Sequence, residues 1–151
     1  MRPAARSSAA LAVVLVLLPA CSGGGSSSSA PTRSQFTQQA LAICHSYQNR
    51  ISRLQGSANL NQLAAQGRNA IALQRAELRQ LRALTPPAAD RDQIEKMFDS
   101  LDSATGTADA LVAAATRGDA VSTAAAAAKL RGELAAVNKL AKPYGLDVCA
   151  S

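Results

Sequence analysis

Four stretches of helical periodicity constrain the fold of this chain more than any other feature. Apolar residues recur at three- and four-residue steps, which gives each stretch one apolar face, over residues 34–54, 59–84, 88–117 and 120–142. Glycine or proline, which end or interrupt helices, follows each stretch at Gly56, Pro86-Pro87, Gly118 and Pro143. Apolar–polar alternation of the kind typical of strands is absent from the sequence. The pattern therefore predicts an all-α fold.

Short connections between the four predicted helices favour an antiparallel, up-down-up-down four-helix bundle over residues 34–151. Ser34 and Asp119 are residue types that cap helix N-termini, so we expect the first and fourth helices to begin there. In this topology the fourth helix ends beside the start of the first.

The first 20 residues have the features of a cleaved signal peptide. Arg2 and Arg6 precede a short apolar run over residues 11–18, which is shorter than the ~20 residues of a membrane-spanning helix. The sequence Leu18-Pro19-Ala20-Cys21 resembles the lipobox of bacterial lipoprotein precursors, in which the cysteine is acylated. The resemblance implies a lipid on Cys21. The alternative is an ordinary signal peptide cut near Ala20.

Residues 21–33 are rich in glycine and serine, a composition typical of a flexible tether. Together with the leader, this segment favours a domain held by lipid at the extracytoplasmic face of the cell membrane. Two acyl chains would make such attachment stable.

Export changes the interpretation of the two cysteines that follow the tether. An even pair in an oxidising compartment predicts a disulfide, here between Cys44 in the first helix and Cys149 in the C-terminal tail. The alternative is a redox or metal-binding thiol pair. The spacing fits no metal motif, and His45, the single histidine, is expected to face solvent and cannot complete a zinc site.

The formal net charge of +6 is unevenly distributed. Seven arginines and only one acid, Glu77, lie between residues 33 and 84, whereas the third predicted helix is acidic. Folding the chain about Pro87 predicts three ion pairs between the second and third helices: Arg75–Asp99, Arg79–Glu95 and Arg82–Asp92. The alternative is a basic face that binds anions. The arginines without predicted partners, and thus the candidate anion-facing residues, are Arg50, Arg53 and Arg68.

The sequence contains no phosphate loop, dinucleotide fingerprint or metal-ligand spacing. We therefore expect no enzyme, no catalytic residues, no cofactor or metal, and no nucleic-acid partner. The expected function is that of a membrane-tethered, non-enzymatic binding or structural module acting through its surface. The alternative is a carrier that holds a small apolar ligand or lipid between the helices. A stripe of small residues on the fourth helix offers a face for a protein partner or a second copy: Ala124, Ala128 and Gly132.

Several of these features together resemble uncharacterised secreted helix-bundle proteins and lipoproteins of actinobacterial type. The resemblance covers most of the chain after the tether. It rests on Cys44, Leu81-x-x-Leu84-x-Pro86-Pro87, Ala114-x-x-x-Gly118-Asp119 and Gly145-Leu146-x-x-Cys149. These motifs are caps, turns and cysteines, so the resemblance implies a fold and carries no activity.

Overall fold

The computed structural model describes residues 30–54 and 60–150, and all the regular structure within them is helical. The four long helices are α1 (Arg33–Ser52), α2 (Leu60–Arg82), α3 (Arg91–Thr116) and α4 (Ala120–Ala141). Three short 3-10 turns accompany them: η1 (Ala88–Asp90), η2 (Lys142–Tyr144) and η3 (Asp147–Ala150). The prediction of an all-α fold is confirmed. None of the helices in these two ranges has the length and hydropathy needed to span a bilayer.

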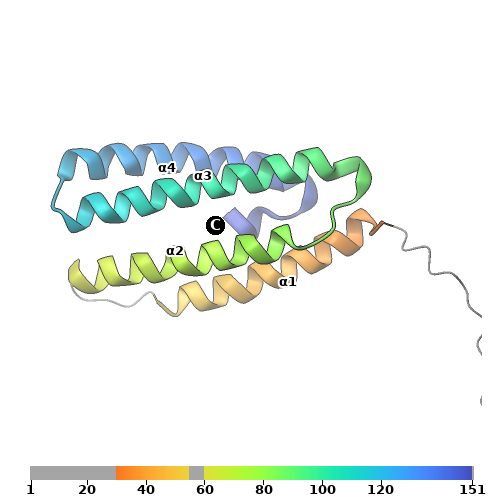
Figure 1. Ribbon diagram of the computed structural model, residues 1–151, viewed down its shortest axis with the longest axis horizontal. Coiled ribbons are helices and arrows are strands. Elements are labelled where there is room, and N and C mark those ends of the chain that lie inside the picture. The colour runs from red at the N-terminus through yellow and green to blue at the C-terminus, as the bar shows by residue number, and fades with distance from the viewer. Residues whose placement is uncertain (1–29, 55–59, 151) are drawn as a thin grey trace, which may run out of the picture.

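Each helix runs antiparallel to the one before it, as the up-down-up-down topology requires (Figure 1). The helices form two hairpins, α1 with α2 and α3 with α4, which join where α2 packs against α3. After α4 the chain turns back, and η3 packs against both α1 and α4. The C-terminal tail therefore fills the space between the first and last helices.

The start of α1 is fixed by Thr32, and the predicted cap at Ser34 is wrong by two residues. The Thr32 hydroxyl accepts from the Gln35 backbone N–H at 3.2 Å, and the Thr32 backbone N–H donates to Gln35 Oε1 at 2.9 Å. This reciprocal capping box satisfies two groups at the helix end that would otherwise lack partners. Because the box needs Gln35 three residues after the cap, it selects Thr32.

The turn before α4 forms as the sequence predicts. Gly118 has φ 73°, a left-handed conformation that suits glycine after a helix. The side chain of Asp119 then accepts from the Ser122 backbone N–H at 3.0 Å. Gly145, with φ 65°, reverses the chain after η2 in the same way and directs the tail back into the bundle.

The register of α2 against α3 differs from the predicted one. None of the three expected ion pairs forms: Arg75–Asp99, Arg79–Glu95 and Arg82–Asp92. Arg82 Nη2 instead lies 2.7 Å from Asp99 Oδ1. Arg75 Nη2 lies 3.0 Å from Asp109 Oδ2. Arg79 pairs with no acidic side chain within the described ranges. The two helices are therefore joined by ion pairs, but by other partners.

The connection between α2 and α3 explains this shift. Thr85, Pro86 and Pro87 run outside any helix, and η1 adds a further turn before α3 begins at Arg91. The chain thus advances beyond the end of α2 before it reverses (Figure 1). Arg82, the last residue of α2, pairs with Asp99 of α3. The eight residues of α3 before Asp99, or about 12 Å of helix, therefore extend beyond the end of α2. This overhang brings Asp90 to the start of α1.

The core joins all four helices and the tail. Its fully buried large side chains come from every element that packs inward: Phe36, Leu81, Ile94, Leu101, Val137 and Leu146. Further along the bundle, α2 and α3 approach closely at Gly67, where a Cβ atom on that residue would lie 2.8 Å from Cγ2 of Val112.

Candidate functional site

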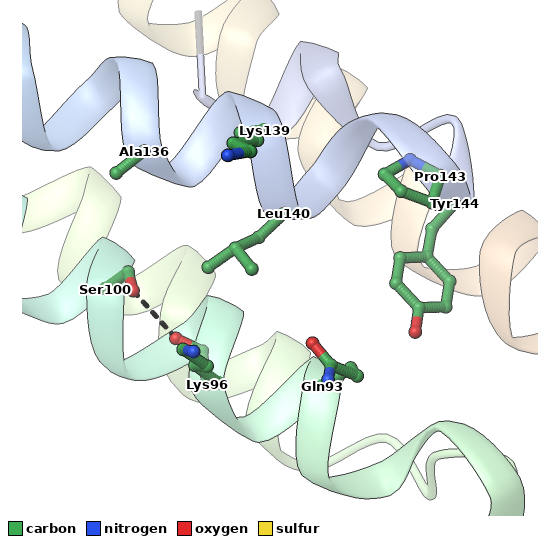
Figure 2. Close-up of a pocket in the computed structure, with 8 residues that line it drawn as sticks. All are labelled: Gln93, Lys96, Ser100, Ala136, Lys139, Leu140, Pro143 and Tyr144. Carbon is green, nitrogen blue, oxygen red and sulfur yellow. Dashed lines mark hydrogen bonds between the residues drawn. The ribbon is translucent and has the colours of Figure 1, made fainter.

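A recess on the surface lies along α3 and α4 (Figure 2). It is an open groove of about 640 Å³, lined by Gln93, Lys96, Ser100, Ala136, Lys139, Leu140, Pro143 and Tyr144. Leu140 points from α4 toward α3, with Lys139 and Lys96 on the two helices beside it. We refer to this recess as the α3–α4 groove.

The lining of the α3–α4 groove combines positive charge with apolar surface. Lys96 and Lys139 supply the charge and the lining includes no acidic residue, while Leu140 and Pro143 contribute apolar atoms. The Ser100 hydroxyl donates to the Lys96 carbonyl at 2.8 Å, so it is engaged within α3. The groove is chemically suited to an anionic group carried next to an apolar one.

A smaller hollow of about 320 Å³ near Arg82 also contains Glu95 and Asp99, so its charge is mixed.

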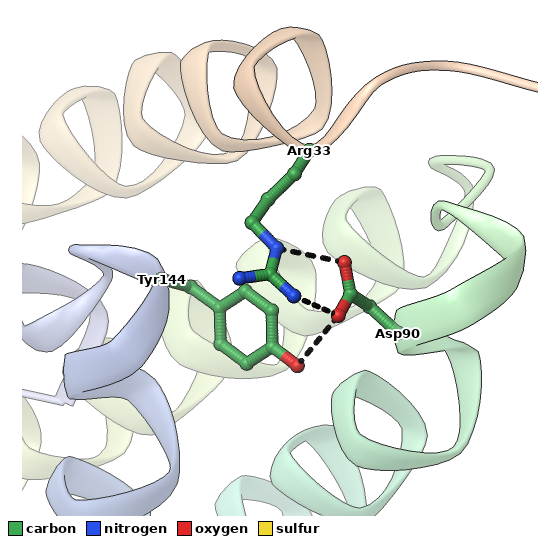
Figure 3. Close-up of polar contacts among 3 residues, drawn as sticks. All are labelled: Arg33, Asp90 and Tyr144. Atoms are coloured by element: carbon green, nitrogen blue, oxygen red, sulfur yellow. Dashed lines mark hydrogen bonds and ion pairs between the residues drawn. The ribbon is translucent and has the colours of Figure 1, made fainter.

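A second polar arrangement joins the start of α1, the α2–α3 connection and η2, the turn that follows α4 (Figure 3). Arg33 Nε donates to Asp90 Oδ2 at 2.8 Å, and Arg33 Nη2 pairs with the other oxygen. The Tyr144 hydroxyl donates to Asp90 Oδ1 at 3.5 Å, and the Arg33 guanidinium stacks 5.2 Å from the centre of the Tyr144 ring. This Arg33–Asp90–Tyr144 cluster ties together three segments that are distant in sequence.

Electrostatics in this cluster follow from its hydrogen bonds. The hydrogen bonds that Arg33 donates to Asp90 lower the pKa of Asp90, and the same contact raises the pKa of Arg33. Burial raises the pKa of Tyr144. Because the bidentate pairing satisfies the Asp90 carboxylate, the cluster is suited to holding these elements in place.

The third arrangement lies inside the bundle, where Cys44 and Cys149 form the predicted disulfide with their Cα atoms 5.0 Å apart. This separation is ordinary for a disulfide, for which about 4.4–6.8 Å is usual. Glu77 of α2 lies against the bond, and one of its oxygens and the two sulfurs are all within 4.8 Å of one another. The Glu77 side chain is completely buried, and neither of its oxygens has a hydrogen-bond partner within the described chain. Burial raises the pKa of Glu77 to about 7.

The remaining site residues expected from the sequence are not brought together into one site. Cys21 lies outside the described residues. Arg50, Arg53 and Arg68 are exposed, and none forms an ion pair with an acid in the ranges that the structure covers. Arg50 stacks on Tyr47, with its guanidinium carbon 5.1 Å from the ring centre. His45 is exposed, as expected.

The stripe of small residues on α4 also has the expected exposure. Ala124, Ala128 and Gly132 all face solvent. Val121, one turn before them on the same helix, is 82% exposed. This side of α4 is therefore exposed to solvent.

Sequence reasoning missed Glu77 and Asp90 as residues of interest. Glu77 stands one residue before the buried Leu78, so its position on the inner face of α2 could have been noticed. Asp90 offered no comparable signal, because its pairing with Arg33 depends on how far the connection overhangs α2.

Comparison of the chain with protein-family models, with curated proteins and with solved structures finds no significant match.

Proposed function

We propose that this chain is a lipid-anchored module of the cell envelope that acts through its surface and without catalysis. The leader and the lipobox-like Cys21 support export and anchoring. The capping box at Thr32 starts α1 directly after the Gly/Ser segment, which fits a folded domain standing off a membrane on a tether. The Cys44–Cys149 disulfide fits an oxidising, extracytoplasmic compartment.

The α3–α4 groove is the observation that carries the surface part of the proposal. It places two lysine ammonium groups beside an apolar floor in an open recess of about 640 Å³. We infer that its partner presents an anionic group next to apolar surface. The carrier alternative receives less support, because the space between the two hairpins is filled by core side chains such as Phe36 and Leu146.

Replacing Cys21 with serine in intact cells tests the anchor. The Cys21→Ser protein is expected to leave the membrane fraction or to accumulate as an unprocessed precursor, because the thiol that would carry the lipid is absent. Fractionation followed by mass measurement of the N-terminal peptide distinguishes these outcomes from a normally processed protein. A variant that is processed and stays on the membrane as the wild type does would refute the anchor.

Site-specific photocrosslinking tests the groove. A photoreactive residue at Ser100, within the groove, is expected to capture a partner in intact cells, and one at the exposed Ala42 of α1 is the matched control. Charge reversal of Lys96 and Lys139 should remove the product at position 100. Equal capture from both positions, or insensitivity to charge reversal, would contradict the proposal. A product at twice the mass of the protein would indicate self-association, for which the exposed face of α4 is the candidate surface.

A further inference from the structure

Three side chains that can ligate metals meet in the interior of the bundle, and each comes from a different element. Cys44 belongs to α1, Glu77 to α2 and Cys149 to η3. The two cysteines are 0% and 4% exposed, and Glu77 is 0% exposed. One Glu77 oxygen and the two sulfurs lie within 4.8 Å of one another.

The burial of Glu77 without a partner is the observation that calls for an explanation. Carboxylates inside proteins are nearly always hydrogen-bonded, paired with a cation or bound to a metal, because an isolated charge loses its hydration. Neither Glu77 oxygen accepts a hydrogen bond from a described residue, and no lysine or arginine within the described ranges forms an ion pair with it. Both oxygens thus lack a hydrogen-bond donor, and one of them lies within 4.8 Å of both sulfurs.

We propose that the reduced form of this protein holds one zinc ion between the thiolates of Cys44 and Cys149 and the carboxylate of Glu77. Two thiolate sulfurs and one carboxylate oxygen supply three protein ligands, and a water molecule would complete the four positions of a tetrahedral zinc site, as in zinc sites with three protein ligands. Thiolate ligands favour zinc over magnesium and calcium, which prefer all-oxygen sites. Zinc–sulfur distances of about 2.3 Å and zinc–oxygen distances of about 2.0–2.2 Å require the two bonded sulfurs to separate on reduction, whereas one Glu77 oxygen already lies within 4.8 Å of both.

The exchange between the two forms balances as follows. A dithiol reductant supplies two electrons and two protons, the Cys44–Cys149 bond breaks, and the reductant becomes a disulfide. Zinc then displaces one proton from each cysteine thiol and any proton on the Glu77 carboxyl. In the reverse direction a disulfide oxidant accepts two electrons from the two thiolates and takes up two protons to become a dithiol, the Cys44–Cys149 bond forms again and the zinc ion is released. The disulfide and the zinc site are therefore alternative states of the same two sulfurs. This inference is independent of the surface function proposed above.

Metal titration of the purified full-length protein tests the proposal. The protein is reduced with a non-thiol phosphine under anaerobic conditions and titrated with zinc against a chromophoric chelator. One zinc ion per chain is expected to bind the reduced protein, and none the disulfide-bonded protein. Cobalt substituted for zinc should give thiolate charge-transfer and tetrahedral ligand-field bands. Glu77→Gln should weaken zinc affinity by more than about tenfold, the lower cost of losing an outer-shell partner, because it removes a direct ligand.

Glu133→Gln is the matched control, because it makes the same change in a carboxylate that accepts from Ser103 on the other hairpin. It should bind zinc as the wild type does. Circular dichroism follows folding in parallel, and zinc is expected to raise the Tm of the reduced wild type but not that of Glu77→Gln. The proposal is overturned if reduced protein binds no zinc, if Glu77→Gln binds as tightly as wild type, or if reduced protein is unfolded with and without zinc.

Discussion

At the scale of single residues, Glu77 makes stability depend on pH in an unusual direction. An ordinary surface glutamate is ionised in both the folded and the unfolded chain at neutral pH, so it contributes little pH dependence. Glu77 is completely buried, and its pKa rises to about 7 from the ordinary 4.5. The folded protein therefore binds the Glu77 proton more tightly than the unfolded chain does.

We predict that the free energy of unfolding of the disulfide-bonded, metal-free protein falls as pH rises from about 4.5 to about 7. Below pH 4.5 the Glu77 carboxyl is protonated in both the folded and the unfolded protein, so the folded state carries no buried charge and its stability is highest with respect to this group. Between the two pKa values only the unfolded chain loses its proton, and above about 7 the folded state carries a buried charge. The difference in pKa corresponds to at most about 3 kcal/mol. Urea unfolding at about pH 4.5, 6 and 8 measures it.

The variant Glu77→Gln supplies the control, since its amide resembles the protonated carboxyl but does not titrate. Its stability should change little over the same pH range, so that it exceeds the wild type most clearly at about pH 8. A wild type and a Glu77→Gln protein with parallel pH profiles would show that Glu77 is solvated in the folded state.

At the scale of elements, the four helices and their antiparallel order were predictable, but the axial register of α2 against α3 was not. Apolar periodicity, Gly118, Asp119 and the proline pair locate four helices to within a few residues, because each signal acts on its own neighbourhood. The register of α2 against α3 depends instead on the path of residues 83–90. A fold point at Pro87 treats that connection as a tight turn, whereas its extended and 3-10 portions displace α3 along its axis.

The same reasoning explains why the candidate sites were only partly predictable. The disulfide followed from counting cysteines and from topology. The Arg33–Asp90–Tyr144 cluster and the α3–α4 groove each combine residues whose proximity depends on the axial position of α3 and on the reversal at Gly145. The sequence pattern of a single helix does not reveal how close its residues lie to those of another element.

Close contact between α2 and α3 at Gly67 makes a prediction at this scale. Gly67→Ala should destabilise the protein by up to about 2 kcal/mol, although alanine is the better helix former. The added Cβ would lie 2.8 Å from Cγ2 of Val112, whose branched side chain has little rotamer freedom in a helix. Thermal unfolding of the two proteins measures the change.

Two further variants separate the packing contribution from helix propensity. Gly106→Ala adds a methyl group where nothing lies within 4 Å, so it should stabilise α3 by about 0.5–1 kcal/mol. Adding Val112→Ala to Gly67→Ala should recover part of the loss, because the clashing methyl groups are removed. If Gly67→Ala stabilises the protein as Gly106→Ala does, the two helices are further apart than described.

At the scale of the whole molecule, two hairpins are joined by a limited set of connections. α2 packs on α3, the Arg33–Asp90–Tyr144 cluster holds the start of α1 to the end of α4, and the disulfide ties the middle of α1 to η3. The middle and end of α1 otherwise pack mainly against α2 and the tail. Stability should therefore be unevenly distributed, with α3 and α4 the most persistent part.

Removing the disulfide tests this distribution. The double variant Cys44→Ser/Cys149→Ser should lose at most about 4–5 kcal/mol, because the bond closes a loop across a sequence separation of 105 residues. Since domains of this size have about 5–15 kcal/mol in total, we expect a folded but locally weakened protein. Amide hydrogen exchange should show protection lost first in η3 and in residues 45–52, then in the start of α1 near Arg33, and last in α3 and α4. The disulfide-bonded wild type under the same conditions is the reference. A uniform loss across all four helices would instead mean that the two hairpins unfold as one cooperative unit.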